Sequence, residues 1–376
     1  MKKIAIIGGG LQGIEIAFLA KEAGYRTLLL DKKPEPPALG LVDEFIQADV
    51  NDLDNNLPGK ISFEIDMIFP AFEDYRGLQI LNELRDKLPP LVLDLNSYKI
   101  SSSKKASREF FEEYSLPCAM TLPEAEFPLI IKPDGGSGSQ GVNLVGSEEE
   151  LLEAKELYDG DFLIEEFLTG PAYSIEVLGF DDEIYPLEVT RLIFDDEYDC
   201  RKVLAGNFID NEIVKSLKEL GKITAEKLNL QGIMDLEVVA TESGLKLLEI
   251  DARFPSQTPT AVYRSSGINM VKMLADLYLE GETGEHLNNK NKAAIYEQIY
   301  IKNNKVFFTG EHIMTEAGRL EVDNDFFGAD FALTDYNGRG NDWYAILHFW
   351  AENLMKVEAK SEKFKTELES FLLNFN

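Results

Sequence analysis

Short apolar runs alternate with amphipathic stretches at the start of the chain. Runs at residues 3–8, 26–31, 67–72 and 91–95 predict buried strands, and residues 13–24 and 78–88 predict helices. Strands that alternate with helices favour a parallel sheet covered by helices. We therefore expect residues 1–96 to form one small α/β domain.

Beyond residue 96 the pattern becomes α+β and rich in hairpins. Apolar runs predict strands at 127–133, 142–147, 161–168, 172–180, 183–194, 233–241 and 245–254, with helices at 101–117, 148–158 and 211–230. The stretch 291–376 mixes short strands with a terminal helix over 351–375. We expect a second domain over 97–290 and a C-terminal α/β segment over 291–376, which completes the catalytic core or forms an interface.

Composition excludes several classes of function. The net charge of −30 argues against a nucleic-acid partner, because phosphate backbones require clustered Lys and Arg. No run approaches the ~20 apolar residues of a membrane span. Two cysteines in 376 residues fit a reducing compartment, so we expect a cytoplasmic protein. Three scattered histidines disfavour histidine-based metal or acid–base chemistry.

The N-terminal glycine turn raises the question of a dinucleotide cofactor. Gly8, Gly10 and Gly13 follow a predicted strand in the spacing G-x-G-x-x-G, and Asp31 ends the next strand. This spacing is typical of NAD-binding sites. Taken alone, the turn favours an NAD-dependent oxidoreductase, although any helix N-terminus attracts an anion, including an amino acid's carboxylate.

A glycine-rich loop follows the strand that ends at Lys132. Residues 134–141 read DGGSGSQG, with Ser137 and Ser139 among four glycines. Glycines allow backbone N–H groups to approach phosphate oxygens, and a lysine at the base of the loop supplies a point charge. The loop is not a Walker motif, and a flexible hairpin loop is the alternative.

Carboxylates gather on a predicted hairpin near residue 240. Glu249 and Asp251 are two residues apart, so they share one face of a strand, and Glu237 lies on the partner strand. Hard oxygen ligands of this kind suit Mg²⁺ that bridges nucleotide phosphates. Arg253 shares the face and could hold a transferring phosphate. A solvated acidic edge is the alternative in so acidic a chain.

These pieces occur in an order that resembles the ATP-grasp superfamily of carboxylate–amine ligases. Lys104 at a predicted helix start comes first, then KPDGGSGSQG, then EEFLTGP at 165–171, then the Glu237 strand and LLEIDAR at 247–253. The resemblance covers residues 1 to about 290. It implies an ATP-grasp fold preceded by a Rossmann-like pre-ATP-grasp domain, in which the glycine turn serves a co-substrate instead of NAD.

The resemblance also implies a role for each matched residue. Lys104 and Lys132 would contact ATP phosphates, with Ser137, Ser139 and Gln140 in the flap. The adenine hinge would comprise Glu165, Glu166, Phe167 and Leu168. Two Mg²⁺ would be held by Glu237, Glu249 and Asp251. Arg253 would steady an acyl phosphate and act, with Lys132, as a catalytic residue.

Two departures from the family pattern affect these roles. Many relatives bind ribose through a Glu where this chain has Ala172, so Glu176 or Glu165 is the replacement we expect. The family's metal-ligating Asn is Asp251 here, which adds a negative charge and leaves the metal number open.

The substrates implied are small amino acids. The turn at Leu11 and Gln12 would help form the co-substrate site, Glu73, Asp74 and Asp235 would bind ammonium groups, and Arg191 and Ser256 would take carboxylates. Relatives are often dimers, so the resemblance leaves a homodimer as one of the oligomeric states to test. Three alternatives remain: an NAD-dependent oxidoreductase, a non-catalytic ATP-binding regulator, and another ATP-grasp ligase, including one that carboxylates a purine intermediate. The first domain has few arginines, Arg26, Arg76 and Arg85, which disfavours the ligase that carboxylates a purine intermediate, because such an enzyme needs a basic pocket for phosphate.

Overall fold

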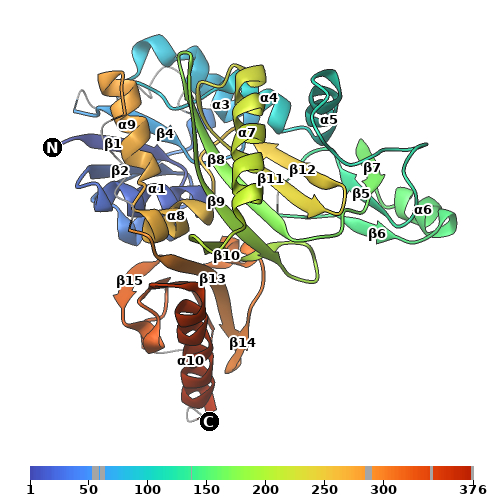
Figure 1. The fold of residues 1–376 in the computed structure, drawn as a ribbon. Helices are drawn as coiled ribbons and strands as arrows, with labels where there is room; N and C mark the ends of the chain where they lie inside the picture. Colours follow the sequence, from blue (N-terminus) through green and yellow to red (C-terminus); the bar gives the residue numbers. More distant parts are fainter. Residues whose placement is uncertain (53–58, 60–63, 137, 284–289, 339–341, 374–376) are drawn as a thin grey trace.

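The computed structural model of the chain describes residues 1–52, 59, 64–136, 138–283, 290–338 and 342–373 (Figure 1). In this part of the chain, the strands form a parallel four-stranded sheet, an antiparallel three-stranded sheet and a large antiparallel sheet of ten strands. The mixed α/β architecture agrees with the fold class expected from the sequence.

The N-terminal layer is a parallel sheet with strand order β3-β2-β1-β4. Its strands are β1 (Lys3–Ile7), β2 (Arg26–Asp31), β3 (Glu44–Gln47) and β4 (Met67–Pro70). It is accompanied by α1 (Leu11–Glu22), α3 (Tyr75–Glu83), α4 (Leu95–Ser101) and the short helices η1 (Pro37–Leu41), η2 (Val50–Asp52) and η4 (Arg85–Lys87). β1 is buried along its whole length, as its continuous apolar run predicts.

The prediction of a strand at residues 91–95 is wrong. Leu91 makes only an isolated bridge to Ile68, and α4 begins at Leu95. The reason is local: the carboxylate of Asp94 accepts a hydrogen bond from the backbone N–H of Ser97 at 3.0 Å, and so caps a helix that the apolar pattern did not indicate.

A small lobe projects from one side of the molecule, at the right of Figure 1. Its sheet has the order β6-β5-β7, from β5 (Leu129–Pro133), β6 (Asn143–Val145) and β7 (Phe162–Glu166). α6 (Glu148–Lys155) packs on it and α5 (Lys104–Glu113) lies beside it. The loop between β5 and β6 is the predicted phosphate flap, and it therefore belongs to the edge of this lobe.

The large sheet has the strand order β12-β11-β8-β9-β10-β13-β17-β16-β15, with β14 paired to β13. Its strands are β8 (Ala172–Phe180), β9 (Glu183–Phe194), β10 (Cys200–Ala205), β11 (Gly232–Thr241), β12 (Gly244–Asp251), β13 (Ala293–Lys302), β14 (Lys305–Phe307), β15 (Glu321–Asn324), β16 (Phe331–Thr334) and β17 (Trp343–Ala351). The pairing of β10 with β13 carries the sheet from the central region into the C-terminal segment.

Helices pack on this sheet. They are α7 (Asn211–Leu228), α8 (Thr258–Ser266), α9 (Met270–Glu280) and α10 (Leu354–Leu373), with the short helices η5 (Glu311–Glu316) and η6 (Phe326–Gly328). α7 contacts β8 and β9, while α10 packs on β13 and β17 (Figure 1). None of the helices in the described ranges combines the length and apolar character that a membrane crossing needs.

Candidate active site

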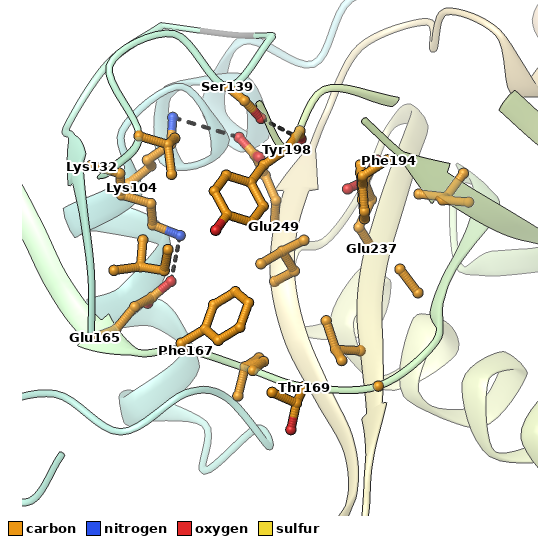
Figure 2. Close-up of a pocket in the computed structure, with 18 of the residues that line it drawn as sticks. Lys104, Lys132, Ser139, Glu165, Phe167, Thr169, Phe194, Tyr198, Glu237 and Glu249 are labelled. Atoms are coloured by element: carbon orange, nitrogen blue, oxygen red, sulfur yellow. Dashed lines mark hydrogen bonds and ion pairs between the residues drawn. The ribbon is translucent and has the colours of Figure 1, made fainter. Parts of the chain in front are cut away.

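A cavity of about 510 Å³ lies between the three-stranded lobe and the large sheet. Its walls include the flap, the hinge after β7, and the facing strands β9, β11 and β12 (Figure 2). The predicted residues that line it are Lys104, Lys132, Ser139, Gln140, Glu165, Glu166, Phe167, Leu168, Glu237 and Glu249. The structure thus brings most of the predicted nucleotide residues to one cavity from five separate segments.

The two predicted phosphate lysines are held by carboxylates. Nζ of Lys132 lies 2.5 Å from Oε1 of Glu165, and both side chains are buried. Nζ of Lys104 donates to the carbonyl of Gly136 at 2.8 Å and lies 3.8 Å from Oε1 of Glu249 (Figure 2). The register of β5 and β7 sets Lys132 next to Glu165, because Lys132 pairs with Leu163 and Ile130 with Glu165.

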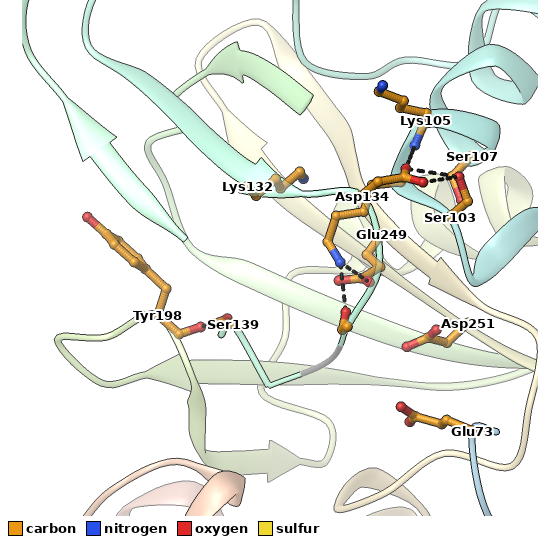
Figure 3. A network of polar contacts seen from close by, with 12 residues as sticks. Glu73, Ser103, Lys105, Ser107, Lys132, Asp134, Ser139, Tyr198, Glu249 and Asp251 are labelled. Atoms are coloured by element: carbon orange, nitrogen blue, oxygen red, sulfur yellow. Dashed lines mark hydrogen bonds and ion pairs between the residues drawn. The ribbon is translucent and has the colours of Figure 1, made fainter. Parts of the chain in front are cut away.

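Asp134 fixes the position of Lys104. Its carboxylate accepts hydrogen bonds from Ser103 Oγ at 2.9 Å and from the backbone N–H of Lys105 at 2.7 Å (Figure 3). Its carbonyl accepts from the N–H of Lys104 at 2.9 Å. Since Asp134 directly follows β5, these bonds tie the start of α5 to the base of the flap.

A hydrogen bond joins the flap to the loop between β9 and β10. Ser139 Oγ donates to the carbonyl of Tyr198 at 2.7 Å. Ser139 has φ of +53°, a left-handed conformation that is uncommon outside glycine. Gln140 is exposed and lines the cavity. Ser137, the other predicted flap residue, lies outside the described residues.

The predicted metal carboxylates form two rows across adjacent strands. In the first row, register pairs Glu249 on β12 with Glu237 on β11 and Ser174 on β8; in the second, it pairs Asp251 with Asp235 and Glu176. Directly opposed residues point to the same face of a sheet, so all five acids share one face. The shift of register between Glu237 and Val238 keeps the two Glu side chains opposite each other.

A second, smaller cavity of about 90 Å³ lies over these rows. Its lining includes six carboxylates and one arginine, namely Asp199, Asp235, Glu237, Glu249, Asp251, Glu311 and Arg253. Desolvation raises the pKa of Glu237 and of Asp251 well above their usual range, and the neighbouring acids add to the effect. Desolvation also raises the pKa of Asp235 to about 7.

Arg253 offsets part of this negative charge. Its Nη2 donates to Asp251 Oδ2 at 3.0 Å, and its Nε lies 2.9 Å from Oε1 of Glu73. Gln12 Nε2 donates to the same oxygen of Glu73 at 3.0 Å. Desolvation opposes the charge of Arg253, yet Asp251 and Glu73 outweigh it and raise its pKa. The network therefore links the start of α1 to the acidic face.

The acidic rows fit Mg²⁺. Glu237 and Glu249 present carboxylate oxygens to the same space, and like-charged acids in a narrow cavity are costly unless they are protonated or a cation lies between them. Carboxylate oxygens are the ligands that Mg²⁺ prefers. Bound there, the metal would supply charge neutralisation for nucleotide phosphates.

Four predicted residues are not gathered at the two cavities in the predicted way. Glu176 is fully buried and lines neither cavity, so the structure does not bring it to a ribose position. Arg191 borders the larger cavity but lies opposite Tyr173, on the face away from the acids. Asp74 caps α3 by accepting from the N–H of Gly77 at 3.2 Å. Leu11 packs against the core.

Two of the remaining predicted substrate residues, Asp235 and Ser256, line the smaller cavity. Glu73 and Gln12 are not part of its lining; Glu73 forms an ion pair with Arg253 of the cavity, and Gln12 donates to Glu73. The sequence reasoning missed Tyr198, Asp199 and Glu311, which also line the smaller cavity. Asp199 and Glu311 come from segments far from any motif, and only the acid-rich composition of the chain could have hinted at them.

The glycine turn is closed by the chain itself. The N–H of Gly9 donates to Asp31 Oδ2 at 2.6 Å, and the carbonyl of Gly9 accepts from the N–H of Ala38 at 3.0 Å. A Cβ built on Gly9 would lie 2.6 Å from Cβ of Pro36. Asp31 and the backbone of Gly9, which would hold a dinucleotide, are thus engaged internally. This geometry disfavours the NAD alternative.

Comparison with known proteins gives consistent results. Residues 101–257 match a family model described as an ATP-grasp domain. The 3-methyl-D-ornithine–L-lysine ligase of Methanosarcina mazei is 34% identical over 374 residues, which cover 98% of this chain and 96% of that protein.

Two solved structures share the fold over nearly the whole chain. The ADP complex of an N5-carboxyaminoimidazole ribonucleotide synthetase has a TM-score of 0.73 at 20% identity, covering 98% of this chain and 96% of that one. The L-amino acid ligase of Bacillus licheniformis has a TM-score of 0.72 at 17% identity, covering 98% of each chain.

Proposed function

Because this chain belongs to the ATP-grasp family of carboxylate–amine ligases, we propose that it joins 3-methyl-D-ornithine to L-lysine. As a member of the family it is an ADP-forming enzyme that uses ATP and Mg²⁺ to form an amide bond. The proposed product links the ornithine carboxylate to the Nε amine of lysine, as pyrrolysine biosynthesis requires.

The observation that carries the substrate proposal is the charge of the smaller cavity. Six carboxylates face one arginine there, beside the cavity that would hold the nucleotide. Even with Mg²⁺ bound at Glu237, Glu249 and Asp251, the other three acids favour cationic substrates over neutral or anionic ones. Two diamino acids match this charge, and a phosphorylated purine intermediate does not.

The reaction proceeds in two steps on this geometry. A carboxylate oxygen of the ornithine attacks the γ-phosphorus of ATP, the bond to ADP breaks, and an acyl phosphate forms. The lysine nitrogen then attacks the carbonyl carbon, a C–N bond forms, and phosphate leaves with the electron pair of the C–O bond.

In our proposal, residues of this chain act in both steps. Lys104 and Lys132, which line the larger cavity, would contact the ATP phosphates, and Arg253, which lines the smaller cavity, would bind the acyl phosphate. Three carboxylates, Glu237, Glu249 and Asp251, would hold two Mg²⁺. Phe167 and Leu168 would receive the adenine, and Glu165 the ribose, since the methyl group of Ala172 cannot form a hydrogen bond with it.

The C-terminal segment completes this active site in our proposal. Residues 291–376 continue the large sheet through β13, and they bring Glu311 into the smaller cavity. We place the domain boundaries near residues 96 and 290. A homodimer stays a prediction, which the molar mass in solution would test.

Phosphate release from ATP tests the function directly. L-lysine and D-ornithine, as an unmethylated analogue, are added separately and together with Mg²⁺, and products are weighed by mass spectrometry. Release that requires both, with a product one water lighter than their sum, is expected. Release with other amino acids and none with this pair would favour a different amino-acid ligase of the same family. ATP binding without any release would favour a regulator.

A further inference from the structure

Glu311 is a carboxylate of the smaller cavity that neither the metal site nor the nucleotide site uses. It begins η5, which follows β14 in the C-terminal segment. It is not on the strands that carry Glu237, Glu249 and Asp251. Its presence at the site therefore depends on the fold, which brings the C-terminal segment against the strands of the acidic rows.

Two side chains hold one oxygen of Glu311. Oε2 accepts from Ser256 Oγ and from Gln257 Nε2, each at 2.9 Å. Gln257 is buried and has φ of +69° and ψ of −50°, the strained conformation of a γ-turn, which the hydrogen bond from the N–H of Thr258 to the carbonyl of Ser256 at 2.8 Å closes. Strain of this kind is often found where a side chain must be held in one place, and here it accompanies the amide that fixes Glu311.

The other oxygen of Glu311 faces the reaction space. A Cβ built on Gly138 of the flap would lie 4.0 Å from Oε1, so this oxygen lies beside the flap, which in the proposed function would cover the nucleotide phosphates. No donor within the described part of the chain forms a hydrogen bond with Oε1. Glu311 and Arg253 both line the smaller cavity of about 90 Å³. Oε1 of Glu311 therefore borders the same space as the guanidinium proposed to bind the acyl phosphate, as a base for the attacking nitrogen requires.

We propose that Glu311 binds the ammonium group of the amine substrate and accepts its proton before the nitrogen attacks the acyl phosphate. This inference rests on the proposed function and supplies the base that the amide-forming step needs. The N–H bond breaks and its electron pair stays on nitrogen. The nitrogen then forms the C–N bond, the C–O bond to phosphate breaks, and the departing phosphate takes the second proton that the nitrogen must lose. The proton stays on Oε1 of Glu311 until products leave.

The electrostatic surroundings suit a proton acceptor. Desolvation raises the pKa of Glu311, while Arg253 lowers it and Asp199 raises it. The negative charge of Glu311 in turn raises the pKa values of Asp235, Glu237, Cys200 and Tyr296. His312, the next residue in the chain, has its Nδ1 2.6 Å from Oδ2 of Asp199. A carboxylate with a raised pKa accepts a proton at less free-energy cost than one in water.

The test separates carboxylate activation from amine deprotonation. The variant Glu311→Gln keeps the shape of the side chain and loses the proton acceptor. Two reactions are compared with D-ornithine and ATP: amide formation with L-lysine, and hydroxamate formation with hydroxylamine, which is uncharged at neutral pH. The matched control is Glu188→Gln, because Glu188 is a partly buried carboxylate that accepts from Ser265 Oγ at 2.8 Å and lines a different cavity.

We expect Glu311→Gln to lower amide formation by about 10²–10⁴-fold and to leave hydroxamate formation near the wild-type rate. The acidic limb of the wild-type pH profile for lysine should also disappear in the variant. Loss of both reactions together, or of neither, would overturn the inference. A wild-type enzyme that forms neither product from D-ornithine would instead overturn the proposed function, on which this inference rests.

Discussion

Replacing Lys132 by Met separates two roles that the structure gives to one side chain. Lys132 lines the nucleotide cavity, and it also forms an ion pair with Glu165 at 2.5 Å. Only 8% of the Lys132 side chain and 9% of the Glu165 side chain are exposed. The variant Lys132→Met therefore removes a phosphate contact and leaves a buried carboxylate without its partner.

The expected loss of stability is large. Removal of one partner from a buried pair costs about 3–5 kcal/mol, because the remaining charge is uncompensated. The free energy of unfolding of a protein is about 5–15 kcal/mol, so this loss is a substantial part of its total stability. Replacing both partners by apolar residues of similar volume is often neutral, so the double variant Lys132→Met, Glu165→Leu should recover most of it.

Urea unfolding and ADP binding measure the two roles separately. The double variant should unfold near the wild-type midpoint and still bind ADP weakly. The control variant Lys246→Met breaks the ion pair between Lys246 and Glu166. These two side chains are 19% and 17% exposed, so the variant should lose less stability than Lys132→Met. If Lys132→Met loses less than about 1 kcal/mol, the pair behaves like a surface pair and the reasoning from burial is refuted.

Three further predictions concern other parts of the molecule. Burial raises the pKa of Glu15 to about 7, so the stability that this group contributes is complete below about pH 4.5 and is lost as the pH rises to 7. Across that range, the free energy of unfolding of Glu15→Gln, measured in urea, should rise by about 3 kcal/mol relative to that of the wild type. Parallel pH profiles of the two proteins would contradict this. Gly13→Ala should destabilise by about 1–3 kcal/mol, since its Cβ would lie 2.2 Å from the carbonyl of Gly8, while Gly10→Ala meets nothing within 4 Å; equal melting temperatures would refute the packing argument. Asp251→Ala should raise the Mg²⁺ concentration for half-maximal ADP formation about 10-fold, and an unchanged Mg²⁺ dependence would mean that Asp251 is not a ligand.

The local pattern of the sequence determined most of the elements that carry the site. The hairpin of β8 and β9 and the acidic hairpin of β11 and β12 follow from alternating apolar residues around short turns. The spacing of Glu249 and Asp251 placed both on one face, and the register confirms it. Lys132 at the end of β5, beside a glycine loop, was likewise readable from the sequence.

Other features depend on contacts between residues far apart in the chain. The glycine turn reads as a dinucleotide motif, and only the closure of Gly9 by Asp31 and Ala38 shows that it is occupied internally. The pairing of Lys132 with Glu165 depends on the register of β5 and β7, which no spacing in the sequence specifies. The strand expected at 91–95 failed because the cap at Asp94 outweighed a short apolar run.

The composition of the smaller cavity was decided by the tertiary structure alone. Asp199 and Glu311 carry no motif, and they reach the acidic rows because β10 pairs with β13 and places η5 against the segment after β12. Alternation and turns are properties of a few neighbouring residues, so a sequence determines them directly. The meeting of distant strands depends on burying a shared core, and it is therefore decided only when the whole chain packs.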